Sequence, residues 1–398
     1  MSAKPETAVN LIDSMLDQGL MRGASDIHFE SGQDIFRVRF RIDGLLHIVA
    51  TPAVQLRDAI VSRLKVLARM DIAEKRIPQD GRIQYTYKSE IIDLRVSSLP
   101  TVHGEKIVVR IMNFNRVRPD LHSLGYEADD QLKLRKAIEH PHGLILMTGP
   151  TGSGKTSSLY SCLDLINRTD INLATVEDPA EIQLLGANQV NINEKAGLTF
   201  ASALRALLRQ DPDIIMIGEI RDLETAEIAI QASQTGHLVL STLHTNDAPS
   251  TLARLRHMGI PAFHVAASLT LVTAQRLIRR LCDLCKAPLN AQEAEDLYRL
   301  LAVLRQDARP QQTHQQMTVF KAIGCQACDK GYKGRIGLFQ VMPVSAAMQA
   351  LILCDAPTQA LSAQAAQEGV RTLREVGWLK MLQGVTTMDE VMALTPHE

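Results

Sequence analysis

The sequence contains no long hydrophobic run and no apolar stretch at its start. No window approaches the roughly 18 consecutive apolar residues of a transmembrane helix. The first ten residues, MSAKPETAVN, contain no apolar core of a secretion signal. We therefore expect a cytoplasmic protein that does not insert into the membrane and that reaches it only through partners.

The sequence also lacks an excess of either charge. It has 43 basic and 44 acidic residues, which give a net charge of −1. Proteins that bind nucleic acid usually carry a basic excess, so nucleic acid is not expected as a partner, although a local basic patch is compatible with these numbers. The apolar content of 45% is ordinary for a globular protein, and 398 residues are enough for two or three domains.

Cysteine is scarce, with 6 in 398 residues, which excludes a small scaffold held together by disulfides. Four of the cysteines form two C-x-x-C pairs, Cys282 with Cys285 and Cys325 with Cys328. Two such pairs in a reducing compartment match a tetrahedral structural Zn²⁺ site; a redox pair or free thiols are the alternatives. The long segment between the pairs predicts a helical insertion at about residues 291–305 that projects from the metal.

Basic residues flank the two cysteine pairs. Arg276, Arg279 and Arg280 precede the first pair, and Lys330, Lys333 and Arg335 follow the second. The simplest interpretation of this basic patch is a solvated face of the protein.

The clearest motif in the sequence lies at residues 144–156, LILMTGPTGSGKT. Residues 144–148 predict a short buried strand, and residues 157–167 have the spacing of a helix. Between them stands a complete G-x-x-x-x-G-K-[ST] phosphate-binding loop, to which a chance glycine-rich turn is the alternative. Glycines allow successive backbone N–H groups to turn inward, and the helix that follows points its positive end at the phosphates.

We therefore expect this loop to bind the phosphates of a nucleotide. The residues concerned are Gly149, Pro150, Thr151, Gly152, Ser153, Gly154, Lys155 and Thr156. Lys155 would place its ammonium group on the β- and γ-phosphates, and Thr156 would place its hydroxyl on Mg²⁺.

Two later strands are predicted to end in carboxylates. Residues 173–176 lead into Glu177, and a carboxylate at a strand end suits Mg²⁺ or an attacking water. Residues 213–217 lead into Gly218 and Glu219. Gly218 stands where many such NTPases carry an aspartate, so Glu219 remains to hold the metal through water or to polarise the nucleophile.

A third strand, at residues 238–243, is bracketed by His237 and His244. These histidines are either satisfied structural residues or sensors of the γ-phosphate. Strands that alternate with helices predict a parallel sheet with right-handed crossovers, in which ligands lie at the carboxyl ends of the strands. His237 stands at a strand start and is the exception to this arrangement.

Residues 1–115 look like a separate α+β domain. A helix is predicted at residues 8–21, and in the strand at residues 36–42 apolar side chains alternate with arginines. The dipeptide Asp43-Gly44 predicts a tight hairpin turn. Three further arginines lie on or near the predicted sheet: Arg82, Arg95 and Arg110. They form a solvated strand face, or some of them reach a phosphate held by a neighbouring copy.

Taken together, these segments resemble the secretion-ATPase superfamily, and within it the type II secretion and type IV pilus assembly ATPases. The resemblance covers nearly the whole chain. It rests on residues 25–30 (SDIHFE), 78–82 (PQDGR), the phosphate loop, 176–181 (VEDPAE, similar to the family's Asp box), 213–222 (DIIMIGEIRD, similar to its Walker B strand), 235–248 (TGHLVLSTLHTNDA, similar to its His box) and the cysteine pairs. The cysteine pairs are similar to those of assembly-type members and argue against the retraction type.

The predicted fold class is α/β, with an N-terminal α+β domain of PAS-like type at residues 1–115. A linker is expected at residues 116–137, where proline, glycine and mixed charges show weak periodicity. Residues 138–398 would form a RecA-like P-loop motor domain with a parallel central sheet. This domain would include a tetracysteine zinc module at residues 279–338 and C-terminal helices at residues 339–398.

The resemblance implies a homohexamer that hydrolyses ATP with Mg²⁺, carries Zn²⁺ and moves an inner-membrane platform protein, so that pilin subunits join a filament. It would lie in the cytoplasm, peripheral at the inner membrane, through a membrane-recruitment partner. Larger members carry an extra N-terminal domain that docks on such a partner, whereas the first predicted helix here starts almost at residue 1. By the same resemblance, Glu177 looks like the catalytic base and Glu219 looks like a support for Mg²⁺. Arg95 and Arg110 look like arginine fingers. His237 and His244 look like sensors of the γ-phosphate.

Two other functions are the alternatives. A ring motor that translocates DNA or takes it up would need basic loops that line a pore. A regulatory nucleotide-binding module would use its ring only to change shape. The sequence does not specify whether the client is a pilus, a secretion pseudopilus or a DNA-uptake filament.

Overall fold

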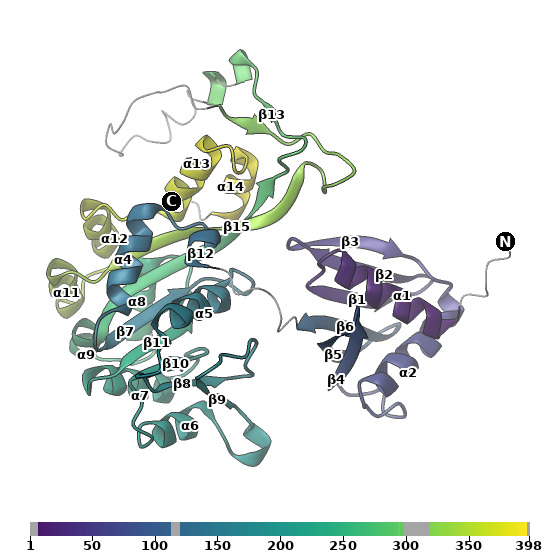
Figure 1. The fold of residues 1–398 in the computed structure, drawn as a ribbon, viewed down its shortest axis with the longest axis horizontal. Coiled ribbons are helices and arrows are strands. Elements are labelled where there is room, and N and C mark those ends of the chain that lie inside the picture. The colour runs from purple at the N-terminus through teal and green to yellow at the C-terminus, as the bar shows by residue number, and fades with distance from the viewer. Residues whose placement is uncertain (1–6, 113–119, 294, 298–317, 396–398) are drawn as a thin grey trace. The chain divides into compact units, whose positions relative to one another are not determined.

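A computed structural model describes residues 7–112, 120–293, 295–297 and 318–395 of the chain. The chain divides into two compact units, Met1–Arg116 and Val117–Glu398 (Figure 1). Each unit has its own sheet and its own hydrophobic core.

The first unit is a six-stranded antiparallel sheet with two helices packed on one face. Its elements are α1 (Ala8–Met21), β1 (Asp26–Ser31), β2 (Phe36–Ile42), β3 (Leu45–Ala50), η1 (Val54–Leu56), α2 (Arg57–Leu67), β4 (Gln79–Tyr87), β5 (Glu90–Thr101) and β6 (Gly104–Met112). The strand order is β3-β2-β1-β6-β5-β4. Apolar side chains of alternate strand positions pack with α1 and α2, which leaves the opposite face to polar and charged residues.

The predicted hairpin between β2 and β3 is confirmed. Asp43 and Gly44 have φ values of 49° and 89°, and a two-residue type I′ turn requires a positive φ at both positions. The alternation predicted along β2 is also present, because Phe36, Val38 and Phe40 are fully buried and the arginines between them are not.

The second unit is built on a seven-stranded sheet with the order β15-β12-β7-β11-β10-β8-β9. Its main elements are α3 (Leu121–Leu124), α4 (Ala128–Ile138), β7 (Gly143–Thr148), α5 (Lys155–Ile166), β8 (Leu173–Glu177), β9 (Asn188–Asn191), η2 (Glu194–Ala196), α6 (Phe200–Leu207), β10 (Ile214–Ile217), α7 (Leu223–Gln234), β11 (Leu238–Leu243), α8 (Ala248–His257), α9 (Ala262–Ser268), β12 (Leu269–Leu281), β15 (Tyr332–Pro343), α11 (Ala346–Leu353), α12 (Thr358–Gln367), α13 (Leu373–Leu382) and α14 (Met388–Leu394). Only the β12–β15 pair is antiparallel among the described strand pairs of this sheet. The predicted α/β fold with a parallel central sheet is therefore confirmed.

Helices cover both faces of this sheet (Figure 1). One buried cluster joins the sheet to α6, α7, α8, α9, α11 and α12. A second cluster on the other face joins it to α3, α4 and α5. Because the central strands are buried on both faces, they read in the sequence as continuous apolar runs such as residues 144–148.

Helices occupy most of the segment where the sequence predicts a linker, residues 116–137. The Tyr126 ring, just before α4, stacks on Phe339 of β15 with 3.6 Å between ring centroids. Leu134 of α4 is fully buried in the core of the second unit. The segment is polar in composition because only one side of α4 is buried, and that side packs it onto the second unit.

The cysteine segment is an excursion between two neighbouring strands. β12 ends at Leu281, directly before Cys282, and β15 begins at Tyr332, shortly after Cys328. Between them, β13 (Ala287–Pro288) and β14 (Phe320–Lys321) pair as a two-stranded sheet. Most of the helical insertion predicted at 291–305 lies outside the described residues. The predicted C-terminal helices start after Pro343, because the residues before it complete β15.

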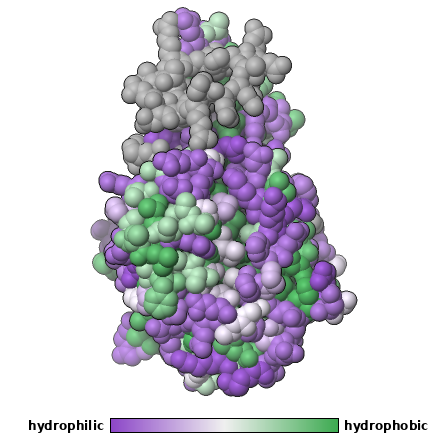
Figure 2. Space-filling view, turned by 90° about the vertical axis from the view of Figure 1, so that its left-hand side faces the viewer, coloured by the Kyte–Doolittle hydropathy of each residue, from purple (hydrophilic) through white to green (hydrophobic). Residues whose placement is uncertain are grey.

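Among the helices of the described residues, none combines the length and the apolar character needed to cross a membrane. Figure 2 shows the face of the second unit that lies on the left of Figure 1, where hydrophobic residues gather in one area among hydrophilic ones. The helices α9 and α11 expose Phe263 and Leu353. Single exposed apolar residues of this kind are normal on a protein surface.

Candidate nucleotide-binding site

The phosphate loop connects β7 to α5, as the sequence predicts. Gly149, which opens the loop, has a φ of 147°, and a Cβ at this position would lie 2.5 Å from the backbone oxygen of Gln275. A glycine is therefore required here by both conformation and space. The Lys155 Nζ donates to the backbone oxygens of Gly149 (2.8 Å) and Pro150 (3.1 Å), so this ammonium group lies across the loop.

The strand register brings the predicted polar groups to the same edge of the sheet. β7 pairs with β11 up to Thr148 and Leu243, and β10 pairs with both β11 and β8. The predicted polar groups therefore all lie at the carboxyl ends of neighbouring parallel strands. These groups are the loop after Thr148 of β7, His244 after β11, Glu219 after β10 and Glu177 at the end of β8. Ligands in parallel α/β sheets bind at this edge.

Glu219 is the carboxylate with the closest electrostatic link to the phosphate loop. It accepts a short hydrogen bond from Arg221, and its Oε2 lies 3.5 Å from the His244 Nε2. Burial raises the pKa of Glu219, but Arg221, His244 and Lys155 outweigh that effect and hold it below its usual value. Glu219 is therefore a charged group that lies among cations.

Lys155 has an unusually low affinity for its proton. Burial lowers its pKa to about 8, and the charge of Arg276 acts in the same direction, while Glu219 opposes both. The ammonium group is thus held in a half-buried site that already contains positive charge. An anion bound beside Lys155 would stabilise its charged form.

Glu177 lies in a different environment from Glu219. Its side chain is buried, and its carboxylate accepts hydrogen bonds from Tyr160 (2.5 Å), Thr175 (2.7 Å) and Gln189 (3.1 Å). Burial, followed by the bond to Glu177, raises the pKa of Tyr160, so its hydroxyl group stays a donor. The sequence offered no signal for this network, because its donors lie on α5, β8 and β9.

The two histidines that bracket β11 lie at opposite ends of that strand. Six extended residues span roughly 20 Å, so His237 is far from the carboxyl edge where His244 lies. The His237 Nδ1 instead contacts the backbone oxygen of Ala232 (2.9 Å) and the Thr235 hydroxyl (3.2 Å). Of the two predicted γ-phosphate sensors, only His244 therefore lies at the ligand edge of its own subunit, whereas His237 lies at the opposite end of the strand.

The predicted arginine fingers belong to the first unit. Arg95 of β5 stands directly opposite Arg110 of β6 and Arg82 of β4, so the three side chains share one face of the sheet. Arg110 donates to Asp26 of β1 over 2.9 Å, yet its side chain is 62% exposed. It could thus exchange this partner for another anion.

The four paired cysteines form one cluster. Their sulfur atoms all lie within 4.8 Å of one another. The Sγ–Sγ distance is 4.0 Å between Cys282 and Cys325 and 3.6 Å between Cys285 and Cys328. Four thiolates around Zn²⁺, each bonded at about 2.3 Å, would place the sulfur atoms about 3.8 Å apart. The donor set and its dimensions therefore fit a structural zinc ion.

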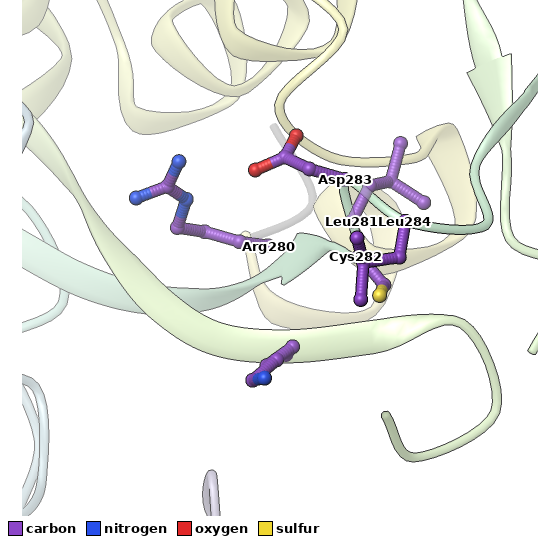
Figure 3. Close-up of a pocket in the computed structure, with 6 residues that line it drawn as sticks. Arg280, Leu281, Cys282, Asp283 and Leu284 are labelled. Carbon is purple, nitrogen blue, oxygen red and sulfur yellow. The ribbon is translucent and has the colours of Figure 1, made fainter. Parts of the chain in front are cut away.

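A cavity of about 390 Å³ adjoins this cluster, lined by Arg280, Leu281, Cys282, Asp283, Leu284 and Lys333 (Figure 3). In Figure 3 the Arg280 guanidinium group points away from the Cys282 sulfur. Arg280 and Lys333 are exposed, which fits the solvated face that the sequence suggested.

Two other arginines of that predicted patch are engaged inside the fold. Arg279 bonds the buried Glu390 (2.6 Å) and lies over the Tyr332 ring, and Arg276 bonds Asn246 (3.0 Å). The predicted single basic patch is therefore wrong for these two residues. Because side chains alternate along β12, Arg276 and Arg279, which are three residues apart, point to opposite faces of the sheet.

A phosphate loop between a strand and a helix of a parallel sheet, with Glu219 and His244 at the same edge, defines the class of P-loop NTPases. Residues 2–393 match the family described as Type II/IV secretion system protein, and the chain belongs to this family.

The chain is 49% identical to the type IV pilus assembly ATPase PilB of Acinetobacter baylyi, over 97% of this chain and 66% of that protein. It is 46% identical to the type II secretion system ATPase E of Vibrio cholerae, over 97% of this chain and 75% of that protein. The chain thus spans about two thirds of the length of PilB.

Two solved structures share the fold. The pilus retraction motor PilT, solved with bound ADP, superposes with a TM-score of 0.63 at 23% identity and covers 98% of both chains. The Legionella pneumophila ATPase DotB superposes with a TM-score of 0.70 at 19% identity and covers 99% of this chain and 97% of that chain. At these identities, the likeness establishes the fold alone.

Proposed function

We propose that this protein is an ATPase that powers assembly of a type IV pilus or a type II secretion pseudopilus. It would act as a homohexamer in the cytoplasm, at the inner membrane, through a platform protein and a membrane-recruitment partner. The PilB and type II secretion ATPase relatives support the proposal that the assembled filament is a pilus or a pseudopilus. The observation that carries the activity is the meeting of the phosphate loop, Glu219 and His244 at one edge of the parallel sheet.

The reaction is phosphoryl transfer from ATP to water, in which positioning and charge neutralisation supply most of the rate. Lys155 would leave the backbone oxygens of Gly149 and Pro150 and bind the β- and γ-phosphates. Thr156 would contact Mg²⁺, which when bound neutralises phosphate charge. His244, which adjoins Glu219, would sense the γ-phosphate.

The surroundings of the two glutamates favour Glu219 as the group that polarises the attacking water. Glu219 is charged, partly exposed and electrostatically linked to Lys155. The oxygens of Glu177 are already taken by three donors in a buried network. In our proposal Glu177 is therefore a positioning residue, which fixes the end of β8, rather than the catalytic base that the family resemblance suggested.

A guanidinium group from a neighbouring subunit would complete the site. Arg95 and Arg110 are the candidates, because they stand side by side on one face of a sheet. An arginine supplied across a subunit boundary typically raises the rate of phosphoryl transfer by about 10³–10⁵. The cysteine cluster would hold Zn²⁺ in a structural role.

The proposal is tested by the ATPase rate of the purified protein with two added ligands. We expect the cytoplasmic part of the platform protein to raise the rate and double-stranded DNA to leave it unchanged. Stimulation by DNA alone would support a DNA-translocating ring instead. Turnover in the Lys155→Ala variant equal to that of the wild type would contradict the whole assignment.

A further inference from the structure

Strand β12 forms a wall of the phosphate loop. It runs parallel to β7, with Ala274 opposite Thr148, so the next residues, Gln275 and Arg276, lie beside the loop that starts at Gly149 (Figure 1). The Gln275 Nε2 donates to the backbone oxygen of Ser153 over 2.9 Å. The loop is thus held by a strand that is distant from it in the sequence.

Arg276 has a vacant hydrogen-bonding nitrogen at this wall. Its Nη2 donates to the Asn246 Oδ1 over 3.0 Å, but its Nη1 is buried and has no hydrogen-bond partner in the described part of the chain. No carboxylate among the described residues forms an ion pair with this guanidinium group. A half-buried arginine whose buried nitrogen has no partner is uncommon, because removal of a charge from water is costly unless an opposite charge compensates it.

Arg276 and Lys155 repel each other electrostatically. Burial lowers the pKa of Arg276, with Asp247 acting in the opposite direction, and the charge of Arg276 in turn helps to lower the pKa of Lys155. Two half-buried cations that repel each other form a site that favours an anion. Because Lys155 is the lysine of the phosphate loop, the anion they share would be a phosphate group.

Other buried polar atoms beside the loop also lack partners. The oxygens of Thr148, Ser153 and Gln275 are buried without a hydrogen bond among the described residues, and each of these side chains is at least 97% buried. Buried polar groups in proteins are normally paired. This cluster is independent of the arginine and leaves polar atoms beside the loop unpaired in the structure without a ligand.

We propose that Arg276 binds the terminal phosphate of the nucleotide held by its own subunit, and that Asn246 holds the guanidinium group in place. The inference rests on the proposed function. Asn246 follows His244 in the segment after β11, and His244 adjoins Glu219, so this segment lies where the γ-phosphate would be. Arg276 therefore distinguishes a triphosphate from a diphosphate within one subunit, whereas Arg95 and Arg110 act across a subunit boundary.

The test measures the affinity of the full chain for a fluorescent non-hydrolysable ATP analogue and for fluorescent ADP. We expect Arg276→Gln to weaken binding of the triphosphate by about 10- to 100-fold, the usual effect of losing a hydrogen bond to a charged group. Its binding of the diphosphate should change much less. Arg276→Lys should recover part of the preference for the triphosphate over the diphosphate. Asn246→Ala should weaken that preference although the charge of Arg276 remains.

Arg168→Gln is the matched control, because Arg168 is an exposed arginine between α5 and β8, away from the ligand edge. It should bind both nucleotides as the wild type does. If Lys155→Ala loses binding but Arg276→Gln keeps the wild-type preference for the triphosphate, the inference is wrong and the proposed function stands. If the wild type itself binds neither nucleotide, the proposed function fails and the inference fails with it.

Discussion

At the scale of single residues, two glutamates of similar sequence context have separate environments. Glu177 is buried and accepts three side-chain hydrogen bonds, whereas Glu219 faces Arg221, His244 and the charge of Lys155. Substitution of Glu177 should therefore affect mainly stability, whereas substitution of Glu219 should affect mainly turnover.

We expect Glu177→Ala to lower the free energy of unfolding by about 1–3 kcal/mol, because buried donors on Tyr160 and Thr175 lose their acceptor. Glu219→Ala should change stability by less than about 1 kcal/mol but reduce turnover by about 10²–10⁴. Denaturant unfolding and steady-state ATPase rates measure the two effects. The reverse pattern, with a stable but inactive Glu177→Ala and an active Glu219→Ala, would restore Glu177 as the catalytic base.

The pKa of Lys155 predicts how nucleotide binding depends on pH. Burial lowers this pKa to about 8 in the free protein, and a bound phosphate would raise it again, because an anion favours the charged lysine. Binding above pH 8 must therefore take up a proton, so the affinity for ADP should fall as the pH rises from about 8. Titrations at several pH values measure this. Lys155→Arg, which stays charged, should show a flatter profile, and an identical fall in that variant would assign the effect to another group.

At the scale of elements, the sequence predicted the parts of the site that local patterns determine. The strand, glycine loop and helix at 144–166 were predicted because all three signals are contiguous, and the Asp43-Gly44 turn because two residues specify it. The network around Glu177 could not be predicted, since Tyr160 and Gln189 reach it only after the chain folds.

The position of Arg276 was missed for a related reason. Its neighbours Arg279 and Arg280 suggested one charged surface, but the pairing of β12 with β7 places Arg276 beside the phosphate loop. A signal was present, because Arg276 lies within the largely buried strand β12 and not beyond it. Only the strand order shows that β12 is the neighbour of β7.

The cysteine cluster gives a prediction for one element. The purified protein should contain one zinc ion per chain, and the Cys282→Ser/Cys285→Ser double variant should contain none, because two thiolates do not complete a tetrahedral site. Elemental analysis measures this directly. Nucleotide binding should persist in the variant, since β12 and β15 remain paired through the sheet. Cys162→Ser serves as a control for loss of a thiol elsewhere, and absence of zinc from the parent protein would refute the metal site.

At the scale of the whole molecule, the two units carry complementary parts of the proposed catalytic site. The first unit presents Arg95 and Arg110 on an open polar face, and the second presents Lys155, Glu219 and His244 at one sheet edge. In a ring with head-to-tail contacts, each site can combine groups from two neighbouring copies. We therefore expect isolated protomers to be nearly inactive.

The measurement that tests this claim most directly is the ATPase rate of mixed rings. Lys155→Ala subunits and Arg110→Ala subunits are each expected to be nearly inactive alone. When they are mixed, some sites join an intact phosphate loop to an intact neighbouring arginine, so the account predicts that activity appears and is greatest near equal proportions. No activity at any ratio, although mass measurements show that the two variants share rings, would contradict a site completed by the neighbour's Arg110.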